Sequence, residues 1–471
     1  MSNKKSKTKG TNKYDTIIIG TGQAGKPLAI ALAKEGWKVA IIEKRFVGGS
    51  CINYGCTPTK TLIASAKAAY LASRSKDFGI YTGKIKVNFA EVIKRKDKIV
   101  KIFRDSVIKS LEENKNIKLI LGTASFLSAN EVGVKLKNGR TQKLQSKNIF
   151  INTGTTPFIP QVDGLDETRY FTSESLMNIK KIPRHLIIIG GSYIAVEFGQ
   201  MFRRFGSEVT LIEKNSKLLA NEDEDVSGEI TQILKDEGIT IFTSASLNSV
   251  KKADSKNIRV TFNVNAKEKI ISCTQIMIAT GMKPNTEKLG LNKAGIQTDE
   301  RGFIKVNEKL ETNIKGIFAL GDVKGGLAFT HVSYDDYRII FANLIKKENN
   351  TTRNRLIPYT IFTDPQIGRI GLSEKEAVTK SIKFKTAKLP MKYSARAIET
   401  GETKGFIKAL IDPETKKILG CAVIGTEGGE IMAMIQIAMM GGLEYTKLRD
   451  GIFSHPTLSE TLNNLFLKFE L

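Results

Sequence analysis

The stretch YDTIIIGTGQAG, from Tyr14 to Gly25, determines the fold predicted for this 471-residue chain. Its first half is largely apolar, as in a buried strand, and its three glycines have the spacing G-x-G-x-x-G. The pattern that follows predicts a helix over residues 27–35 and a second strand over residues 38–43. Strand, glycine turn, helix and strand in this order form a βαβ unit of the kind that binds dinucleotides.

Each glycine of this turn has its own physical role. Gly20 makes the tight turn, Gly22 lets the backbone approach a pyrophosphate, and Gly25 lets helix and strand pack closely. The N-terminus of the helix offers free N–H groups and the positive end of its dipole to the phosphates. Glu43, at the end of the second strand, is placed to bind both hydroxyls of an adenosine ribose.

The same pattern returns later in the chain. A strand is predicted over residues 185–189, a helix over 196–205 and a second strand over 208–213, with Gly190 opening the turn. The acidic residue Glu213 follows Gly190 by the same spacing that separates the corresponding pair in the first copy. Two such units predict two nucleotide-binding domains.

The second copy departs from the first at two positions. Ser192 replaces the middle glycine and narrows the approach to a phosphate, whereas Ala195 is an accepted variant of the third glycine. Glu213 favours NADH, because its carboxylate would repel a 2′-phosphate. Lys214 and Lys217 lie close by in the sequence and would weaken that repulsion, so NADPH stays an alternative.

The remaining elements follow from hydrophobic periodicity. Helical spacing covers residues 89–115, and short strands follow it at 118–121, 131–136 and 148–152. Beyond about residue 350 no nucleotide fingerprint appears. That part predicts an α+β domain with strands near 359–370, 383–389, 405–411 and 418–424 and a helix at 428–440.

Composition and charge exclude several classes of protein. The formal net charge is +25, yet the lysines are scattered and no nucleic-acid motif accompanies them, so no nucleic-acid partner is expected. The longest apolar run, residues 431–440, is too short for a membrane span. Residues 1–13 are predicted to be a disordered basic tail and lack the apolar segment of a secretory signal. The expected location is the cytoplasm.

Two of the four cysteines, Cys51 and Cys56, lie close together in the segment GGSCINYGCTPTK. A structural zinc site needs about four ligands, and this chain offers neither a second cysteine pair nor neighbouring histidines, so no metal ligand set is expected. A plain buried pair would not explain the surrounding glycines, proline and Lys60. A redox pair is therefore favoured. Cys273 and Cys421 are expected to be buried and inert.

The segment that contains these two cysteines resembles the active-site motif of the class I pyridine nucleotide-disulfide oxidoreductases, a family of FAD flavoproteins. Three more segments resemble the family in the same order: IMIATG at 276–281, TNIKGIFALGD at 312–322 and FSHPTLSE at 453–460. The resemblance covers residues 14–471. It implies an α/β fold with two Rossmann-like domains, for FAD and NAD(P), and a C-terminal α+β dimerisation domain.

The same resemblance implies the domain boundaries and the cofactor ligands. The FAD-binding domain is expected at 14–152 and 281–349, the NAD(P)-binding domain at 153–280 and the dimerisation domain at 350–471. The expected FAD ligands are Gly20, Gly22, Gly25, Glu43, Gly49, Lys60, Thr153, Gly154, Gly321 and Asp322. The expected NAD ligands are Gly190, Tyr193, Ile194, Glu197, Glu213 and Gly281.

The resemblance also assigns roles to the redox residues. Cys56 is expected nearer to the flavin as the charge-transfer thiol, and Cys51 is expected to be the interchange thiol that attacks the substrate. Lys60, paired with Glu197, is expected beside flavin N5, and Tyr193 is expected to cover the face where nicotinamide docks. A position at the start of a helix would stabilise the thiolate form of both cysteines.

An acid/base residue completes the implied site. His455, oriented by Glu460, is expected to reach the cysteines from the other subunit, which implies a homodimer with a shared active site. The electron counts of donor and acceptor agree, because a hydride carries two electrons and a disulfide accepts two. An imidazole is the side chain that accepts a proton near neutral pH.

Smaller segments point to one branch of the family. Residues 392–408, 428–434 and 458–466 are similar to mercuric-reductase-like members, and residues 325–338 are similar to reactive-chlorine-resistance reductases. The chain lacks the C-terminal cysteine pair of mercuric reductases and carries His455 where they carry a tyrosine. Dihydrolipoamide dehydrogenase is the alternative. Glutathione reductase ranks third, because it uses arginines that the Glu213 region does not supply.

The sequence therefore predicts an FAD enzyme that takes hydride from NADH. It would pass the electrons through Cys51 and Cys56 to a disulfide or a thiol-bound metal ion. A non-enzymatic flavin-binding scaffold would leave the nucleophile, the base and its orienting carboxylate without a use.

Overall fold

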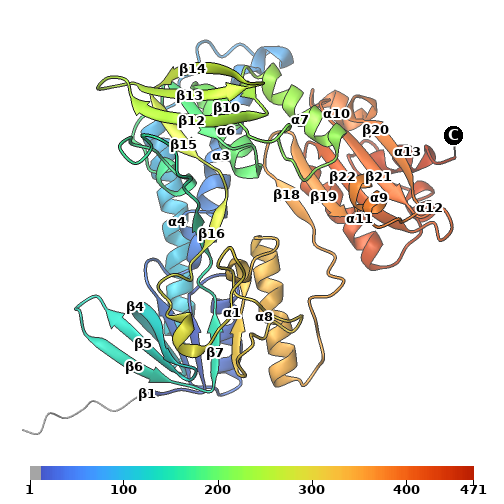
Figure 1. The fold of residues 1–471 in the computed structure, drawn as a ribbon. Coiled ribbons are helices and arrows are strands. Elements are labelled where there is room, and N and C mark those ends of the chain that lie inside the picture. Colours follow the sequence, from blue (N-terminus) through green and yellow to red (C-terminus); the bar gives the residue numbers. More distant parts are fainter. Residues whose placement is uncertain (1–11, 471) are drawn as a thin grey trace, which may run out of the picture. The chain divides into compact units, whose positions relative to one another are not determined.

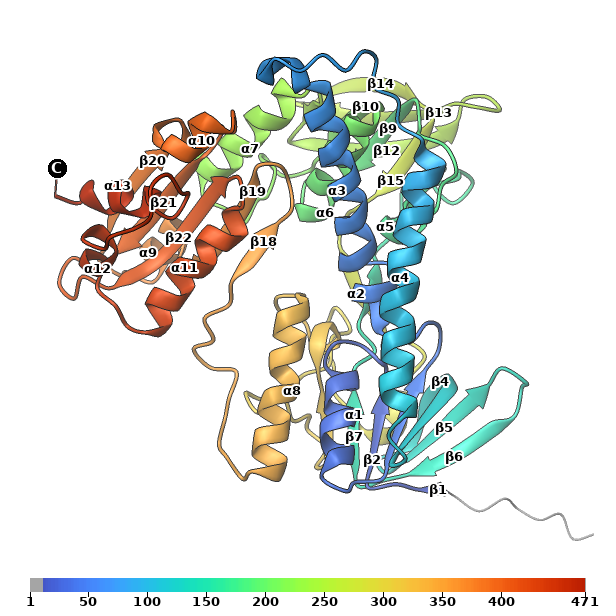
Figure 2. The same ribbon diagram turned by 180° about the vertical axis from the view of Figure 1, so that it is seen from behind.

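The structure is a computed structural model that describes residues 12–470 (Figures 1 and 2). The chain divides into two compact units. Unit 1 contains Met1–Thr59, Lys94–Phe158 and Met282–Asn354, and unit 2 contains Lys60–Ile93, Ile159–Gly281 and Arg355–Leu471. Most of the predicted basic tail lies outside the described residues, although Asn12–Lys13 form the short strand β1. The domain boundaries given above remain predictions.

Unit 1 is built on an eight-stranded sheet whose strand order is β1-β6-β5-β4-β3-β2-β7-β17. The run from β4 to β17 is parallel, and β5 and β6 extend it as an antiparallel hairpin. The strands are β2 Thr16–Ile19, β3 Val39–Glu43, β4 Ile117–Ser128, β5 Glu131–Leu136, β6 Thr141–Gln145, β7 Asn148–Ile151 and β17 Ile317–Ala319. A small second sheet pairs β8 Thr155–Pro157 with β16 Met282–Pro284.

The helices of unit 1 explain the apolar character of its central strands. The residues of β2 and β3 are all buried, as expected for parallel strands covered on both faces. Helices α1 Gly25–Lys34 and α8 Thr330–Ile345 lie side by side and contribute to one core of this sheet (Figure 2). The short helix α2 Gly49–Asn53 follows β3. Helices α3 Cys56–Ser73 and α4 Phe89–Glu112 each have one end in unit 1 and the other in unit 2.

Unit 2 contains the second nucleotide-binding fold. Its parallel sheet has the order β11-β10-β9-β15, with strands β9 His185–Ile189, β10 Glu208–Ile212, β11 Thr240–Phe242 and β15 Gln275–Ile278. Three antiparallel strands follow β11 in the chain and form a sheet of their own: β12 Ala245–Lys252, β13 Ile258–Val264 and β14 Lys267–Cys273. The helices are α5 Ser173–Leu176, α6 Tyr193–Phe205 and α7 Glu224–Asp236.

The C-terminal part of unit 2 is an antiparallel sheet with helices. Its strand order is β18-β19-β22-β21-β20. The strands are β18 Tyr359–Ile361, β19 Gln366–Gly371, β20 Lys385–Pro390, β21 Phe406–Ile411 and β22 Ile418–Gly425. The helices are α9 Glu374–Thr379, α10 Ala395–Glu399, α11 Gly428–Met440, α12 Tyr445–Arg449 and α13 Thr461–Leu467.

One predicted strand, over residues 359–370, is wrong. The segment forms two strands, β18 and β19, which pair with each other in antiparallel fashion. Pro365 lies between them, and a proline has no N–H group to donate to a sheet. The other C-terminal elements, and both βαβ units, lie where the sequence predicts them. The predicted α/β class with two Rossmann-like folds is confirmed.

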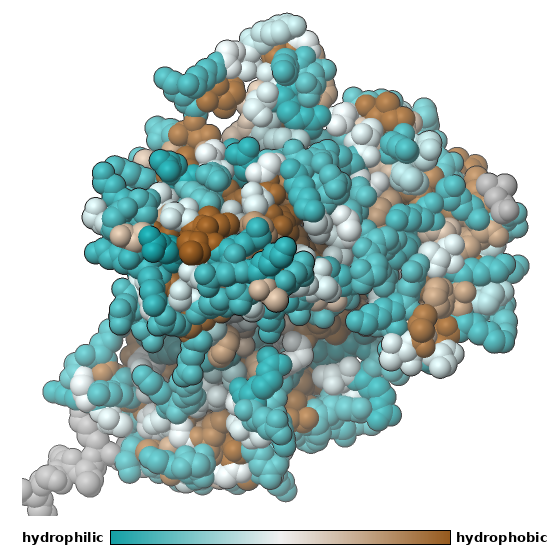
Figure 3. Space-filling model, turned by 45° about the horizontal axis from the view of Figure 1, so that its top comes forward, coloured by the Kyte–Doolittle hydropathy of each residue, from teal (hydrophilic) through white to brown (hydrophobic). Residues whose placement is uncertain are grey.

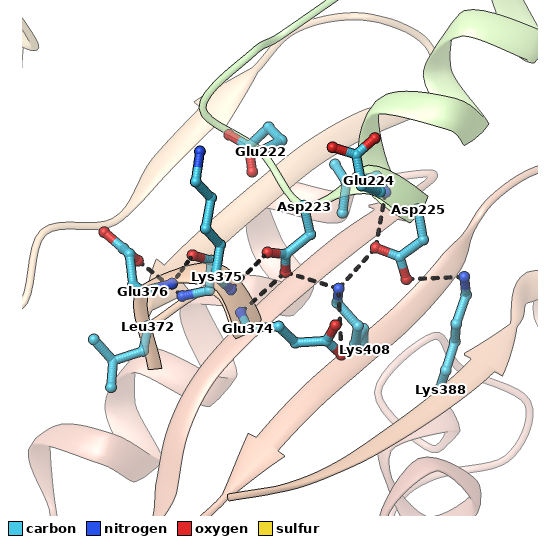
Figure 4. Close-up of polar contacts among 12 residues, drawn as sticks. Glu222, Asp223, Glu224, Asp225, Leu372, Glu374, Lys375, Glu376, Lys388 and Lys408 are labelled. Carbon is cyan, nitrogen blue, oxygen red and sulfur yellow. Dashed lines mark hydrogen bonds and ion pairs between the residues drawn. The ribbon is translucent and has the colours of Figure 1, made fainter. Parts of the chain in front are cut away.

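A buried lysine joins the C-terminal sheet to α7 within unit 2. Lys408, on β21, places Nζ 2.8 Å from Asp223 Oδ2 and 2.7 Å from Asp225 Oδ1 (Figure 4). Glu374 adds a third carboxylate at 3.7 Å. The Lys408 side chain is 1% exposed, so the three acidic groups compensate a charge that water does not reach.

The molecular surface reflects the charged composition. The face shown in Figure 3 carries mostly hydrophilic side chains, with hydrophobic ones in separate groups. Within the described residues, no helix is both long and apolar enough to cross a lipid bilayer.

Candidate active site

The first glycine turn is shaped by close backbone contacts. Gly20 has φ +107°, and a Cβ there would lie 2.2 Å from the carbonyl oxygen of Asn152, so only glycine fits this position. A Cβ at Gly22 would lie 2.8 Å from Asn152 Oδ1, which shows how closely the turn packs on the end of β7. The predicted ligand Gly49 belongs to the same cradle, since its Cβ would lie 2.7 Å from the Cα of Gly22.

Asn152 holds this cradle together, and the sequence did not identify it. Its Oδ1 accepts a hydrogen bond of 2.9 Å from the N–H of Gly25, and its Nδ2 donates one of 2.9 Å to the carbonyl of Leu320. The side chain thereby joins the two predicted FAD segments, which are far apart in the sequence. The sequence contained only a weak signal for Asn152, namely that a polar residue ends an otherwise apolar strand.

Glu43 lies at the expected place but has fewer free acceptor sites than expected. Its Oε2 accepts from the N–H of Thr21 at 3.2 Å and from Thr21 Oγ1 at 2.6 Å, and its Oε1 accepts from the N–H of Arg45 at 2.8 Å. A carboxylate has about four acceptor sites. Three are used within the protein, which leaves about one for a ribose hydroxyl.

The second predicted FAD segment lies beside Asn152. Gly321 donates its N–H to the buried Asp336 at 2.8 Å and opens a short 3₁₀ helix, Gly321–Lys324. Burial raises the pKa of the Asp322 carboxyl, and Thr155 Oγ1 donates to it at 3.5 Å. The backbone of Gly154 accepts from the N–H of Asn285.

The first cradle fits a dinucleotide such as FAD. Thr153 Oγ1 is buried and has no hydrogen-bond partner within the described residues, so it is a polar atom available to a ligand. Glycines line the turn where a Cβ would collide, and a helix N-terminus follows it. The assignment of individual residues as FAD ligands stays a prediction.

The two redox cysteines lie in unit 1 on two different helices. Cys51 is half-buried within the five-residue α2, and Cys56 is exposed and begins the 18-residue α3. Cys51 lies in the first turn of α2, so the two cysteines belong to the starts of two different helices. Only Cys56 lies where a long helix presents its unpaired N–H groups and the positive end of its dipole.

The two thiols interact with each other. A hydrogen bond with Cys56 raises the pKa of Cys51, and burial raises it further. The Thr330 hydroxyl acts in the opposite direction. Cys51 thus retains its proton when its neighbour carries the charge. The other two cysteines, Cys273 and Cys421, are buried as expected, and burial raises the pKa of each to about 12, which makes them poor nucleophiles.

The second glycine turn, in unit 2, repeats the geometry of the first. Gly190 has φ +126°, and a Cβ there would lie 2.4 Å from the carbonyl oxygen of Ala279. Ser192, the departure from the usual motif, has φ −80°, a conformation that any residue adopts without strain. Tyr193 begins α6 and Ile194 follows it; both are half-buried. Gly281 follows the end of β15.

Glu213 lies directly against this turn. A Cβ at Gly191 would be 2.8 Å from Glu213 Oε2. The carboxylate accepts hydrogen bonds from Asn215, through the backbone N–H at 2.7 Å and through Nδ2 at 2.5 Å. These contacts hold a negative charge at the position where the sequence predicts recognition of the nucleotide ribose.

Lys60 and Glu197 form the predicted pair within unit 2. Lys60 Nζ lies 2.7 Å from Glu197 Oε2, and the Glu197 side chain is 3% exposed. Phe362, which the sequence did not identify, completes the arrangement. Its N–H donates to Glu197 Oε1 at 2.8 Å, and its ring lies 4.8 Å from Lys60 Nζ. Both oxygens of the buried carboxylate are thus satisfied, and the ammonium group is fixed from two sides.

His455 and Glu460, also in unit 2, form the predicted acid/base pair. His455 Nδ1 lies 2.9 Å from Glu460 Oε2. A carboxylate only accepts hydrogen bonds, so Nδ1 carries the hydrogen and Nε2 of the neutral ring is the available proton acceptor. The His455 side chain is largely exposed, as a base that serves an external substrate requires. Within residues 12–470, no group of three or more His, Cys, Asp or Glu side chains is arranged to hold a metal ion.

Comparison with known proteins supports the same interpretation. A family model described as pyridine nucleotide-disulphide oxidoreductase matches residues 14–336, and a model of the dimerisation domain of that family matches residues 357–466. The chain is 36% identical over 459 residues to the probable pyridine nucleotide-disulfide oxidoreductase RclA of Escherichia coli strain K12, covering 97% of this chain and 99% of the relative.

Two further relatives belong to different activity classes. A mercuric reductase of Lysinibacillus sphaericus is 35% identical, covering 98% of this chain and 83% of the relative. A dihydrolipoyl dehydrogenase of Chlamydia trachomatis is 32% identical, covering 95% of each chain. A solved structure titled as the Cu(II) complex of the HOCl-induced flavoprotein disulfide reductase RclA superposes with a TM-score of 0.89, covering 97% of this chain and 100% of that one. The chain therefore belongs to the pyridine nucleotide-disulphide oxidoreductase family and is an oxidoreductase of the flavoprotein disulfide reductase type.

Proposed function

We propose that this protein uses FAD and NADH to reduce a disulfide or a thiol-bound metal ion through Cys51 and Cys56. The observation that carries the proposal is the position of Cys51 on α2, the helix whose first residue, Gly49, packs on Gly22 of a cradle that fits a dinucleotide, with Cys56 at the start of the next helix. When bound, FAD supplies a two-electron carrier between the nicotinamide and the cysteine couple. The cytoplasmic location stays a prediction.

The cysteines perform the sulfur chemistry in two displacements. The Cys51 thiolate attacks one sulfur of a substrate disulfide, forms a mixed disulfide and releases the first thiolate. The Cys56 thiolate then attacks the Cys51 sulfur, releases the second thiolate and re-forms the Cys51–Cys56 disulfide. The substrate gains two electrons and the cysteine pair loses two, so the couple must be reduced again in each cycle.

His455 moves the proton in this scheme. Its Nε2 accepts the proton of the Cys51 thiol and passes it to the released substrate thiolate. Glu460 holds the ring in the tautomer that this transfer needs and stabilises the charged imidazolium. We propose that this pair serves the cysteines of the other subunit of a homodimer. The Lys60–Glu197 pair keeps a fixed positive charge on the helix that begins at Cys56.

Apolar side chains support dimerisation through the C-terminal part. Ile437 and Met440, at the end of α11, are largely exposed, as is Ile452, and Leu443 and Leu467 are partly exposed. Exposed apolar residues gathered in one part of a chain commonly mark a protein–protein interface. The match of residues 357–466 to the dimerisation domain of the family agrees with this use.

An anaerobic acceptor assay tests the proposed activity. NADH oxidation by the purified FAD-loaded protein is measured with oxidised glutathione, oxidised lipoamide, Cu(II) and Hg(II) supplied with excess thiol, each in a separate reaction. At least one disulfide or metal acceptor is expected to support turnover. The absence of NADH oxidation with all of them would overturn the proposal.

The assay includes metal ions because the names of two similar proteins refer to a metal ion. RclA has been solved as a Cu(II) complex, and another relative is a mercuric reductase. The alternative function is that of a dihydrolipoyl dehydrogenase, which the third relative favours. Rapid oxidation of dihydrolipoamide with NAD⁺, at hundreds of turnovers per second, would support that alternative.

The nucleotide preference gives a separate prediction. We expect kcat/KM for NADH to exceed that for NADPH by about 10²-fold, because the Glu213 carboxylate repels a 2′-phosphate. The variant Glu213→Gln removes the charge and keeps an acceptor for Asn215, so the NADPH/NADH ratio should rise about tenfold. Steady-state kinetics with both nucleotides measure this ratio.

A matched control variant separates the effect of the Glu213 charge at the nucleotide turn from the effect of changing the protein's net charge. Glu208→Gln removes the same charge from the exposed first residue of β10, and it should leave the ratio unchanged. Equal efficiency of the wild-type protein with both nucleotides would refute the assignment of Glu213.

A further inference from the structure

Arg104, on α4, contacts the segment that separates the two redox cysteines within unit 1. Its Nε donates a hydrogen bond of 2.6 Å to Asn53 Oδ1, and its Cζ lies 4.4 Å from the centre of the Phe46 ring, a cation–π contact. Asn53 is the last residue of α2, so this helix lies beside α4 (Figure 2). It is also the second residue after Cys51 and the third before Cys56. The sequence indicated no role for Arg104.

Asn53 ties the end of α2 to the turn that precedes this helix. Its Nδ2 lies 2.8 Å from the carbonyl oxygen of Gly49, 3.0 Å from that of Val47 and 3.4 Å from that of Phe46. The reverse orientation of the amide would place its oxygen against these three carbonyl oxygens, which donate no hydrogen. Arg104 binds the amide oxygen, so the side chain is fixed at both ends of its amide.

The chain folds back on itself shortly after Asn53. A Cβ at Gly55 would lie 2.9 Å from the carbonyl oxygen of Ser50 and 3.2 Å from the Cα of Cys51. This close return places Cys56, the next residue, where its thiol interacts with that of Cys51. The approach of the two sulfur atoms therefore depends on where α2 ends, and α2 ends at the residue that Arg104 holds.

We propose that Arg104 is a positioning residue that restricts the segment between the two cysteines through Asn53 and thereby favours their disulfide over the pair of thiols. The inference rests on the proposed use of Cys51 and Cys56 as a redox couple. A disulfide requires its two sulfur atoms in a narrow range of relative positions. A segment that is ordered beforehand loses less conformational entropy when this bond forms.

Exchange with glutathione measures this effect as an equilibrium. One cysteine of the dithiol attacks oxidised glutathione, forms a mixed disulfide and releases one glutathione, and the other cysteine then displaces the second glutathione. Two electrons pass from the protein to glutathione, and the two thiol protons end on the two reduced glutathione molecules. The equilibrium constant has the unit of concentration, and it equals the effective concentration of one cysteine thiol at the other.

The test uses the FAD-loaded protein, equilibrated without oxygen in glutathione buffers of different redox composition. Free thiols are then alkylated, and mass spectrometry gives the oxidised fraction of the peptide that contains both cysteines. Arg104→Met removes the donor and the planar cation. It should lower the effective concentration about tenfold, which corresponds to a reduction potential about 30 mV more positive. Lys101→Met removes a positive charge from a largely exposed position of the same helix and should change the value by less than about twofold.

The sign of the change separates positioning from a simple effect of charge. A positive charge near the cysteines stabilises their thiolates and hence the reduced form, so its loss by itself would favour the disulfide and raise the effective concentration. A rise in Arg104→Met would therefore overturn the proposal. An unchanged value in this variant, or an equal fall in Lys101→Met, would overturn it as well.

A double-mutant cycle tests whether Arg104 acts through Asn53. Asn53→Ala removes the amide, and in this background Arg104→Met should change the effective concentration by no more than about twofold. An undiminished tenfold effect in this background would overturn the proposal. Arg104→Leu and Asn53→Ser replace these variants wherever flavin absorbance or Tm shows that a protein is not folded.

The measurement requires neither NADH nor turnover, so its outcome is distinct from that of the acceptor assay. A wild-type protein that forms no disulfide between Cys51 and Cys56 in any of the buffers would refute the proposed function together with this inference. A disulfide that forms equally well in the wild type and in the folded Arg104 variant would overturn this inference alone.

Discussion

Replacing Cys51 with serine is expected to lower the rate of disulfide reduction by about 10⁴-fold or more, the scale seen when a catalytic nucleophile is removed. The serine hydroxyl is a poor nucleophile near neutral pH and cannot form the mixed disulfide with the substrate. The variant should still bind FAD, because none of the cradle contacts around Asn152 involves Cys51. Steady-state assays with the acceptor identified for the wild-type protein, together with the flavin absorbance of the purified variant, measure both properties.

The same substitution elsewhere provides the control. Cys273→Ser makes an identical chemical change at a buried cysteine at the end of β14, and its turnover should stay within a factor of about two, since it touches none of the proposed redox residues. Retention of disulfide turnover by the Cys51 variant would show that electrons reach the substrate without this thiol. The proposed two-displacement scheme would then be wrong.

Replacing Lys408 with alanine is expected to lower the free energy of unfolding by about 3–5 kcal/mol, the usual cost of breaking a buried ion pair by removing one partner. The lysine side chain is 1% exposed and lies between Asp223 and Asp225 (Figure 4). Without it, Asp223 loses the ammonium group that lies 2.8 Å from its Oδ2, and Asp225 retains the contact with the more exposed Lys388. Urea unfolding monitored by circular dichroism measures the change.

Lys388 is a matched control because it contacts the same cluster from the surface. Its Nζ lies 3.0 Å from Asp225 Oδ2, yet its side chain is 40% exposed. Lys388→Ala should therefore cost no more than about 1 kcal/mol. The triple variant Lys408→Met, Asp223→Asn, Asp225→Asn removes the charges together and should recover part of the loss. Equal effects of the two single alanine variants would contradict the importance of burial.

The pH dependence of this effect has a definite sign. Burial raises the pKa values of Asp223 and Asp225. The contacts with Lys408, together with backbone N–H groups at Asp223 and Lys388 at Asp225, outweigh burial, so both pKa values are lowered in the folded protein. A carboxyl group whose pKa is lowered on folding stabilises the protein above its unfolded pKa of about 4, and this contribution is lost as the pH falls through the folded pKa. The difference between wild type and Lys408→Ala should therefore shrink below about pH 4.

At alkaline pH, the stability difference depends on the ionisation of Lys408. Contacts with the two aspartates outweigh burial and raise the pKa of Lys408. Its contribution is fully present below the unfolded lysine pKa of about 10.4 and is lost only as the pH rises through the still higher folded pKa. The stability difference should therefore be constant between about pH 5 and pH 9. A difference that falls steadily across this range would contradict the assignment.

Much of the fold could be predicted because it depends on local patterns. Each βαβ unit combines an apolar run, a glycine turn and an amphipathic helix within a short stretch, and both units form as predicted. Residues 359–370 were predicted as one strand, because hydrophobic periodicity does not indicate where the chain reverses its direction. The two cysteines were expected at the start of a helix, and they lie at the starts of two separate helices, which divide the cysteine motif.

The sequence alone determined the two nucleotide folds, because each follows from local spacing. The pairs Lys60–Glu197 and His455–Glu460 were predicted through the resemblance of their segments to the family, and the structure brings both pairs together. Only the tertiary structure revealed the contacts of Asn152, Phe362 and Thr330. These side chains contact residues at least 127 positions away in the chain. A one-dimensional pattern does not encode such neighbours, since they meet only when parallel strands and helix N-termini from distant segments are packed together.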